Sequence, residues 1–319
     1  DLPNTIQLRK FEKEEKNQRE LSKNLYEIIK HMPKKSHPMD VARTAVSVMG
    51  LEDKETQDSS PEANMRKALR IFAKTPTALA AFYRIRKGKK IIKPKKNLTF
   101  AENFFYMCFG KIPQKEIVKA FDVSLILYAE HSFNVSTFTA RTITSSLSDI
   151  HGAITGAIAS LKGPLHGGAN EEVMHMMSKI KKPENALKWI NNALKNKEVV
   201  MGFGHRVYKS GDSRVPTMRQ YFGKVAKLKK DKKFEKIYDI VEKVMIREKN
   251  IHPNVDYPTG PTYHLMGFDT DFFTPIFVIS RITGWSAHIM EQHAANKLIR
   301  PLASYKGSKH RKVLQLNQR

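Results

Sequence analysis

Three separated stretches of the sequence combine reactive polar side chains with glycine or proline. They are KGPLHGGAN around His166, MGFGHRVYKSGDSRVP around His205 and Arg214, and HPNVDYPTG around Asp256. Because glycine lets a backbone approach a ligand and proline stiffens a turn, each stretch predicts a small loop with a fixed reactive side chain. Two histidines and a carboxylate are residue types that serve general acid and base catalysis. Any of them alone is more simply an ordinary loop residue, so only the combination indicates a site.

Two other kinds of site are not predicted. The stretch MGFGHRVY has Val207 at the position where a dinucleotide-binding fingerprint needs its third glycine. The chain also has neither an HExxH pattern nor paired cysteines, although it contains 12 histidines. We therefore expect no Rossmann domain and no bound metal.

The charge of the chain favours anionic partners. Among its 319 residues, 56 Lys and Arg against 31 Asp and Glu give a formal net charge of +25, which suits nucleic acid, a membrane surface or small acidic metabolites. The basic runs at residues 84–96 and 227–236 carry few aromatic residues, and this is typical of solvated surfaces. Nucleic acid is therefore an unlikely partner, but a non-catalytic, basic nucleic-acid-binding helical protein remains a distant alternative.

The cysteine content and the apolar runs bear on the compartment. Cys108 is the only cysteine, so no disulfide forms within this chain and a reducing compartment is favoured. The longest apolar run, residues 272–285, is interrupted by Pro275 and Arg281. We expect no membrane span and a cytoplasmic protein.

Helical signals predominate, so the predicted fold class is mainly α. Thr99 and Glu102 form a capping box for a helix that ends before Gly110. Thr75 is the predicted N-cap of a further helix that starts at Pro76.

Three longer patterns complete the predicted elements. Apolar residues at spacings of three and four, with small residues between them, predict one central helix from Ser136 to Leu161. An amphipathic surface helix is expected after Pro183. Residues 198–204 form one of the few strand-like stretches.

The order and sequence of these segments resemble the citrate synthase family, which includes the 2-methylcitrate synthases. The resemblance extends through EHSFNVSTFTAR, TDFFTPIFVISRITGWSAHIMEQ and LIRPLASYKG and covers most of the chain from about residue 76 onward. It implies a two-domain, almost all-helical homodimer with the active site in the cleft between the domains. Residues 1–166 and 262–319 would form the large domain and residues 167–261 the small one.

The resemblance also implies a reaction. A citrate synthase is an acyltransferase of the tricarboxylic acid cycle that condenses acetyl-CoA with oxaloacetate and hydrolyses citryl-CoA to citrate and CoA. The CoA thioester is a co-substrate, and no cofactor is bound permanently. A 2-methylcitrate synthase, which takes propionyl-CoA, is the alternative, because one methylene in an apolar pocket changes selectivity only by roughly 10 to 200-fold.

By the same resemblance, three residues have catalytic roles. His166, at the start of a helix, stays neutral and donates a hydrogen bond to the acetyl-CoA enolate, since a helix N-terminus disfavours imidazolium. Asp256 is the base that removes the methyl proton. His205 polarises the ketone of oxaloacetate and protonates the alkoxide.

Further residues are expected to bind the two substrates. The two carboxylates of oxaloacetate need planar, directional donors, which favours Arg over Lys. The resemblance implies that His131, Arg214 and Arg281 bind oxaloacetate within one subunit and that Arg300 of the partner subunit completes the site. For CoA, the loop before His205 is expected to offer its backbone, with Lys209 near a phosphate; the loop residues are Val200, Gly202, Phe203 and Gly204.

Overall fold

The computed structural model describes residues 2–205, 207–208 and 210–319, and within them every regular element is a helix. The only β pairing in this part of the chain is an isolated bridge between Phe203 and Pro253. The mainly α prediction is therefore confirmed. In chain order the elements are α1 (Thr5–Gln18), α2 (Lys23–His31), α3 (Pro38–Glu52), α4 (Pro61–Arg86), α5 (Phe100–Phe109), α6 (Lys115–Tyr128), α7 (Val135–Thr144), α8 (Ile150–Leu161), α9 (Ala169–Ile180), α10 (Pro183–Lys195), α11 (Val215–Lys229), α12 (Lys233–Lys249), α13 (Asp256–Met266), η1 (Thr270–Phe272), α14 (Phe273–Ala294) and η2 (Leu316–Gln318).

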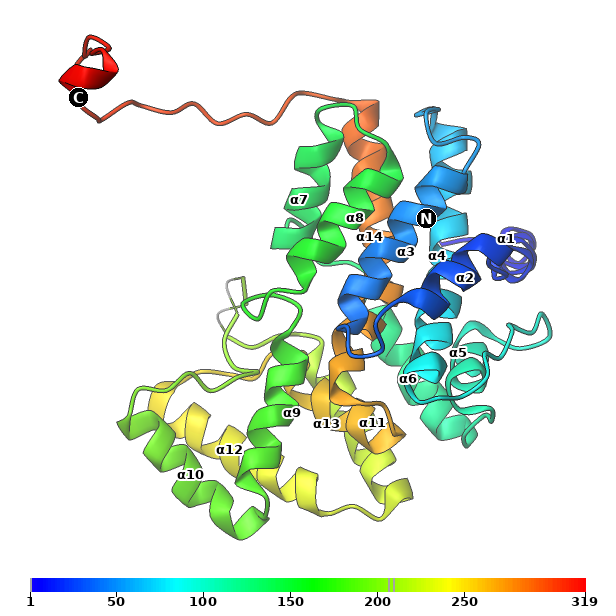
Figure 1. Cartoon of the computed structure of the whole chain (residues 1–319). Coiled ribbons are helices and arrows are strands. Elements are labelled where there is room, and N and C mark those ends of the chain that lie inside the picture. Colours follow the sequence, from blue (N-terminus) through cyan, green and yellow to red (C-terminus); the bar gives the residue numbers. More distant parts are fainter. Residues whose placement is uncertain (1, 206, 209) are drawn as a thin grey trace.

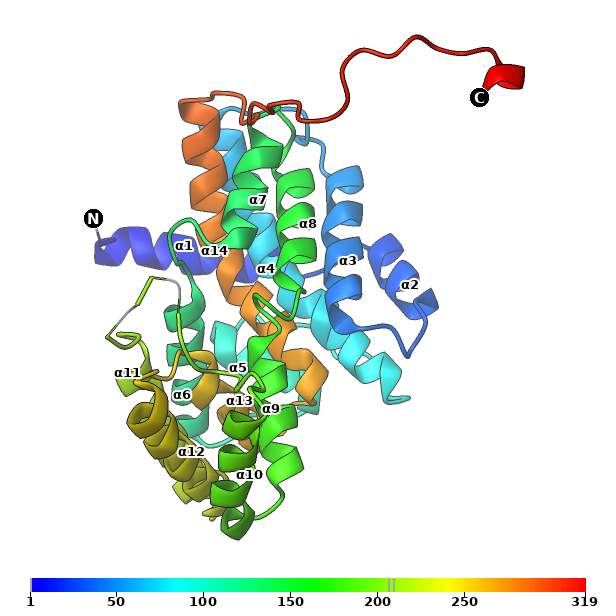
Figure 2. The same ribbon diagram turned by 90° about the vertical axis from the view of Figure 1, so that its left-hand side faces the viewer.

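The helices form two groups that both views separate (Figures 1 and 2). Helices α3, α4, α7, α8 and α14 run side by side in the upper part of the molecule, and α9 to α13 gather in the lower part. Helix α14 is buried along most of its length and contacts members of both groups. It is the central helix of the fold.

The predicted helix from Ser136 to Leu161 is wrong as a single element. It is divided into α7 and α8, which pack against each other. Leu147 in the connection has a φ of 64°, and Asp149 accepts a hydrogen bond from the amide of Gly152 as the N-cap of α8. The small residues do permit close packing, because a Cβ on Gly156 would lie 2.2 Å from Ile143 Cδ1.

Two other local predictions also fail. Pro76 lies inside α4, which begins at Pro61 behind the N-cap Ser60. The residues around Pro76 are buried, and tertiary packing of this kind continues the helix although proline removes one hydrogen bond. The strand-like residues 198–204 form a turn with the isolated bridge at Phe203.

Other predicted helix signals are confirmed. Thr99 and Glu102 form the capping box of α5, and Gly110 follows it with a φ of 76°. The helix expected after Pro183 is α10, and its buried residues include Ala186 and Ile190.

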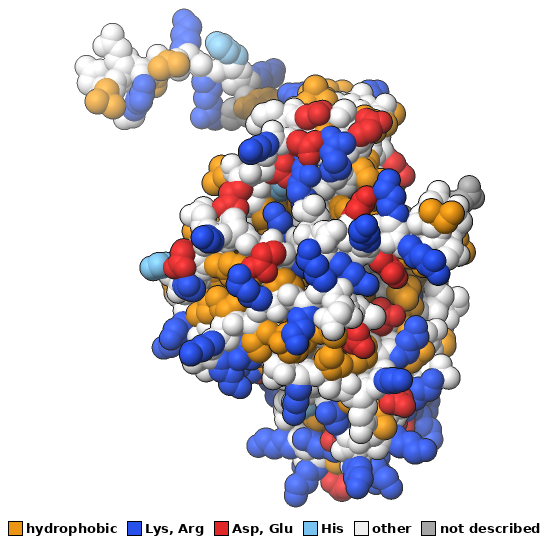
Figure 3. All heavy atoms as spheres, turned by 90° about the vertical axis from the view of Figure 1, so that its right-hand side faces the viewer, with side chains coloured by type: hydrophobic (Ala, Val, Ile, Leu, Met, Phe, Trp, Pro, Cys, Tyr) orange, Lys and Arg blue, Asp and Glu red, His pale blue; other side chains and the backbone are white. Residues whose placement is uncertain are grey.

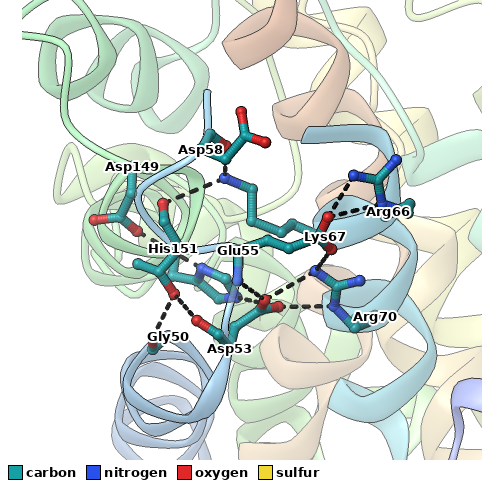
Figure 4. A network of polar contacts seen from close by, with 10 residues as sticks. Gly50, Asp53, Glu55, Asp58, Arg66, Lys67, Arg70, Asp149 and His151 are labelled. Carbon is teal, nitrogen blue, oxygen red and sulfur yellow. Dashed lines mark hydrogen bonds and ion pairs between the residues drawn. The ribbon is translucent and has the colours of Figure 1, made fainter. Parts of the chain in front are cut away.

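A polar cluster joins the ends of α3, α4 and α8 (Figure 4). Arg70 donates to both carboxylate oxygens of Asp53 and also to Glu55. Lys67 is fully buried and donates to the carbonyl oxygens of Thr56 and Asp58. Because buried cations are costly unless they are paired, this cluster fixes the connection between α3 and α4.

The surface carries the basic charge in a dispersed form. On the face in Figure 3, Lys and Arg side chains lie among fewer Asp and Glu side chains over the helical body. After α14 the chain leaves the helices as an exposed, mostly extended segment. Along the described stretches of chain, no helix is both long enough and apolar enough to cross a bilayer.

Candidate active site

A cleft of about 650 Å³ collects most of the residues that the sequence singled out. Its walls come from the loop between α6 and α7, the turn before α9, the loop before α11, the start of α13 and the middle of α14. The cleft therefore joins the two groups of helices. The predicted residues that line it are His131, His166, Val200, Gly202, Phe203, Gly204, His205, Arg214, Asp256 and Arg281.

His166 lies in the turn before α9 with a fixed ring. Its Nε2 accepts a hydrogen bond of 3.1 Å from the backbone amide of Ser136 and lies 2.8 Å from the Ser136 hydroxyl. Because an amide only donates, Nε2 carries no proton, and the neutral ring has its proton on Nδ1. Burial, followed by the charge of Arg281 and by the interaction with His131, lowers the pKa of His166 to about 4. The ring is neutral at pH 7.

The cause of this neutrality differs from the one expected. Helix α9 begins at Ala169, so His166 precedes it rather than starting it. The lowered pKa of His166 agrees with the expected neutral ring, and burial is its main cause, with Arg281 second.

Asp256 is the first residue of α13, and its carboxylate is held by Tyr128. The Tyr128 hydroxyl donates to Asp256 Oδ1 at 2.5 Å. Burial raises the pKa of Asp256 to about 6, although the hydrogen bond from Tyr128 and the charge of Arg214 both act to lower it. A carboxylate with this pKa is a stronger base than an ordinary Asp.

His131 and His205 face each other at the cleft, with ring centroids 4.9 Å apart. His205 Nδ1 accepts hydrogen bonds from the amides of Val207 and Tyr208 at 3.0 and 3.3 Å, so its neutral ring carries the proton on Nε2. Burial and Arg214 lower the pKa of both histidines. Among the described residues, His131 Nε2 is buried without a hydrogen-bond partner, as expected of a group that faces a ligand.

Two arginines supply the positive charge of the cleft. Arg281 is 1% exposed, and its Nε donates to the carbonyl oxygen of Tyr128 at 2.7 Å. Burial and the nearby Arg214 lower the pKa of Arg281 to about 10, so it remains charged at pH 7. Arg214 forms a bidentate pair with Asp212 at 2.9 and 2.8 Å. Arg281 is thus a buried cation without a carboxylate partner in an ion pair among the described residues, beside the half-buried Arg214, and this arrangement favours an anionic ligand.

The loop before His205 has a tightly constrained backbone. Gly202 has a φ of 84°, and a Cβ there would lie 2.7 Å from Val173 and 2.9 Å from Tyr257. Two backbone hydrogen bonds join the loop to the segment before α13. The amide of Gly204 donates to the carbonyl oxygen of His252, and the amide of Asn254 donates to the carbonyl oxygen of Gly202. Only glycine fits at Gly202 without displacing its neighbours.

Two predicted residues lie elsewhere. Arg300 is exposed on the extended segment after α14. It is not among the described residues that line the cleft of its own chain. Lys209, expected near a CoA phosphate, lies outside the described residues.

Sequence reasoning missed the residues that hold the reactive groups in place. Tyr128 binds Asp256 and Arg281, Ser136 binds His166, and Asp212 binds Arg214. Tyr128 precedes His131 closely, and Asp212 precedes Arg214 in the same loop. Their proximity to candidate residues was the available signal, but only the fold shows which side chains meet.

Comparisons with known proteins agree on one family. The family described as "Citrate synthase, C-terminal domain" matches residues 1–302. The chain is 50% identical over 314 residues to a citrate synthase of Mycolicibacterium smegmatis, covering 98% of this chain and 84% of the relative. It is also 50% identical over 311 residues to a 2-methylcitrate synthase of Mycobacterium tuberculosis, covering 98% and 79%.

Solved structures give the same result. A ternary complex of carboxymethyl coenzyme A and oxaloacetate with the citrate synthase of the archaeon Thermoplasma acidophilum aligns with a TM-score of 0.93 at 32% identity, covering 100% of this chain and 86% of that one. The citrate synthase of Thermotoga maritima aligns with a TM-score of 0.90 at 35% identity, covering 100% and 85%. The chain therefore belongs to the citrate synthase family of acyltransferases, which convert an acyl group to an alkyl group and use an acyl-CoA co-substrate without a bound cofactor.

Proposed function

We propose that the protein is a citrate synthase, which condenses acetyl-CoA with oxaloacetate and hydrolyses citryl-CoA to citrate and CoA. The observation that carries this proposal is the meeting of a buried base, Asp256, and a neutral histidine, His166, in a cleft lined by two arginines. Removal of a methyl proton by a carboxylate requires stabilisation of the enolate at the same time. The relatives named above are synthases, which favours an enzyme over a non-catalytic binding protein.

In the first step Asp256 takes the proton from the thioester methyl group while His166 stabilises the enolate oxygen. The neutral ring of His166 donates from Nδ1, because Nε2 is occupied by the amide of Ser136. A neutral donor of this kind stabilises an enolate without first giving up its proton.

In the second step the enolate carbon attacks the ketone carbon of oxaloacetate. His205 polarises the ketone oxygen and then protonates the alkoxide, acting from Nε2 because Nδ1 is held by two amides. Arg214, Arg281 and His131 bind oxaloacetate, and Arg300 of the partner subunit completes the site in a homodimer. The exposed position of Arg300 beyond α14 suits that role.

The CoA moiety is assigned to the loop before His205. Its residues Val200, Gly202, Phe203 and Gly204 line the cleft and run directly into His205. Residues 167–261 would form a small domain that closes over the bound substrates. Closure would exclude water until the carbon–carbon bond has formed, which protects the thioester from early hydrolysis.

A 2-methylcitrate synthase is the second candidate, because relatives with each name are 50% identical to this chain. The two reactions share every residue assigned above and differ by one methylene in the thioester. The test is free-thiol release from acetyl-CoA and from propionyl-CoA in the presence of oxaloacetate, with kcat/KM measured for each. A higher kcat/KM with acetyl-CoA supports the first candidate and a higher value with propionyl-CoA the second. Absence of activity with both would overturn the proposed function.

A further inference from the structure

Glu171, in the first turn of α9, connects three helices outside the cleft. Its Oε1 accepts hydrogen bonds from the amide of Thr274, at 3.2 Å, and from the Thr274 hydroxyl. Its Oε2 lies 3.4 Å from Nε2 of His37, the N-cap residue of α3. The side chain of Glu171 is 12% exposed. It joins α9, from the lower group of helices, to α3 and α14 of the upper group.

The donors around Glu171 match its carboxylate. The N-cap residue of helix α14 makes no side-chain hydrogen bond to the helix. Glu171 instead accepts a hydrogen bond from the amide of Thr274 in the first turn, at the helix end that favours negative charge. His37 Nδ1 accepts from the amide of Met39. In either charge state His37 therefore carries a proton on Nε2, which it directs at Glu171.

The same threonine lies beside the turn that carries His166. The Thr274 hydroxyl lies 3.3 Å from the carbonyl oxygen of Gly167, the residue after His166. Gly167 has no room for a side chain, because a Cβ there would lie 2.5 Å from Leu161. The turn therefore lies between α8 and the N-terminus of α14, so a shift of α9 relative to α14 would be expected to move His166.

The opposite face of α9 packs against the other reactive segments. The side chain of Val173 lies so close to two glycines that an added Cβ would be 2.7 Å from it at Gly202 and 3.3 Å from it at Gly260. Gly202 belongs to the loop before His205, and Gly260 lies on α13 one turn beyond Asp256. A displacement of α9 would therefore move the loop of His205 and the helix of Asp256 together.

From these contacts we propose that Glu171 is a positioning residue: it fixes the start of α9 against α14 and α3, and this fixed point aligns His166 with Asp256 when the cleft closes. The proposal rests on the proposed synthase function. It assigns Glu171 an effect on the catalytic step, acting through His166. A residue that merely joined two parts of the fold would change the stability of the protein and leave the catalytic constants of the folded enzyme unchanged.

The test compares three variants of the full chain. Glu171→Ala removes the acceptor, Glu171→Gln keeps an oxygen for the Thr274 amide, and Glu172→Ala removes an exposed carboxylate from the same helical turn. We measure kcat and KM for oxaloacetate by thiol release, together with the melting temperature of each variant. Since a misplacement of about 1 Å can cost roughly 100-fold in rate, we expect Glu171→Ala to lower kcat by roughly 10-fold or more. Glu171→Gln should recover part of this loss, because it keeps the acceptor for Thr274 but turns an NH2 group toward the Nε2 proton of His37. Glu172→Ala should match the wild type.

A second readout follows the closed state directly. The affinity for a non-hydrolysable CoA thioether is measured by calorimetry with and without saturating oxaloacetate, and Glu171→Ala should reduce the ratio of the two affinities. If Glu171→Ala does not fold, Thr274→Val is measured instead. This variant replaces the hydroxyl with a methyl group and keeps the amide bond to Glu171, so a smaller loss of kcat is expected.

The possible failures are distinguishable. A wild-type protein that is inactive with both thioesters contradicts the proposed function. The positioning role alone is overturned if the wild type is active and folded Glu171→Ala has the same kcat and the same affinity ratio. The same holds for Thr274→Val where that variant replaces Glu171→Ala. Equal losses in Glu171→Gln and Glu171→Ala also overturn it, since the hydrogen bond to Thr274 would then have no effect.

Discussion

The hydroxyl of Tyr128, at the C-terminal end of α6, donates a 2.5 Å hydrogen bond to Oδ1 of Asp256, the first residue of α13. Burial raises the pKa of Tyr128 well above its ordinary value, so the hydroxyl keeps its proton at neutral pH and can donate a hydrogen bond to Asp256. The bond favours the charged form of Asp256, whereas burial opposes it. The pKa of the proposed base is therefore set by opposing effects, burial on one side and the hydrogen bond from Tyr128 on the other.

The first prediction concerns the pH dependence of catalysis. Because Asp256 must be deprotonated, kcat/KM should rise with pH through about 6, whereas His166, with a pKa of about 4, stays neutral over this range. Tyr128→Phe removes a hydrogen bond that lowers the pKa of Asp256, so the rise should move to higher pH. The pH profiles of thiol release for both proteins test this. A shift of the variant to lower pH, or no shift, contradicts the assignment of Asp256 as the titrating base.

The second prediction separates the chemistry of Asp256 from its effect on stability. Asp256→Asn should lower kcat by roughly 10² to 10⁴-fold, the usual contribution of a general base. In the folded protein the pKa of Asp256 is about 6, above the ordinary value near 4. The folded state thus binds this proton more tightly, and wild-type stability falls as pH rises from about 4 through 6. Above pH 6 the melting temperature of the variant should exceed that of the wild type. A lower melting temperature of the variant at pH 8 would show that the carboxylate is stabilising.

The third prediction uses two glycines with left-handed backbones. Gly202 and Gly267 have φ values of 84° and 97°. An added Cβ at Gly202 would collide with Val173 and Tyr257, whereas one at Gly267 would have no heavy atom within 4 Å. Gly267→Ala should cost only backbone strain, about 1–3 kcal/mol. Gly202→Ala should lower the free energy of unfolding further and raise KM for the acyl-CoA. Denaturant titrations and steady-state kinetics of both variants provide the comparison, and equal effects would remove the special role of the loop.

The fourth prediction concerns the proposed sharing of the site in a homodimer. Arg300→Ala and Arg214→Ala should each inactivate the protein, because each removes a residue proposed to bind oxaloacetate. In a heterodimer of the two variants, one site retains both arginines, so mixing them under conditions of subunit exchange should restore about half of the activity per heterodimer. Exchange is verified with differently tagged chains. If exchange is complete and activity does not return, Arg300 acts within its own chain or not at all.

The candidate site residues could be selected from local patterns together with the family resemblance. His166 and His205 lie beside glycine, Asp256 lies two residues before a proline, and Arg281 interrupts an otherwise apolar run. The resemblance supplied the roles assigned to them. The helices at Thr99 and Pro183 were also predictable, since capping and amphipathic patterns depend on residues only a few positions apart. These features, and the all-helical class, belong to the sequence itself.

Tertiary structure alone decided the rest. One helix was expected from Ser136 to Leu161, but the chain turns at Leu147, and Asp149 caps a second helix. The cap is a local signal that the periodic pattern obscured, whereas the close approach of Ile143 to Gly156 is a tertiary contact that periodicity does not encode. The pKa of His166 falls because of burial and Arg281, and that of Asp256 rises because of burial opposed by Tyr128. The physical reason is the same in each case: desolvation and charge act through space, so their strength depends on which distant segments the fold brings together.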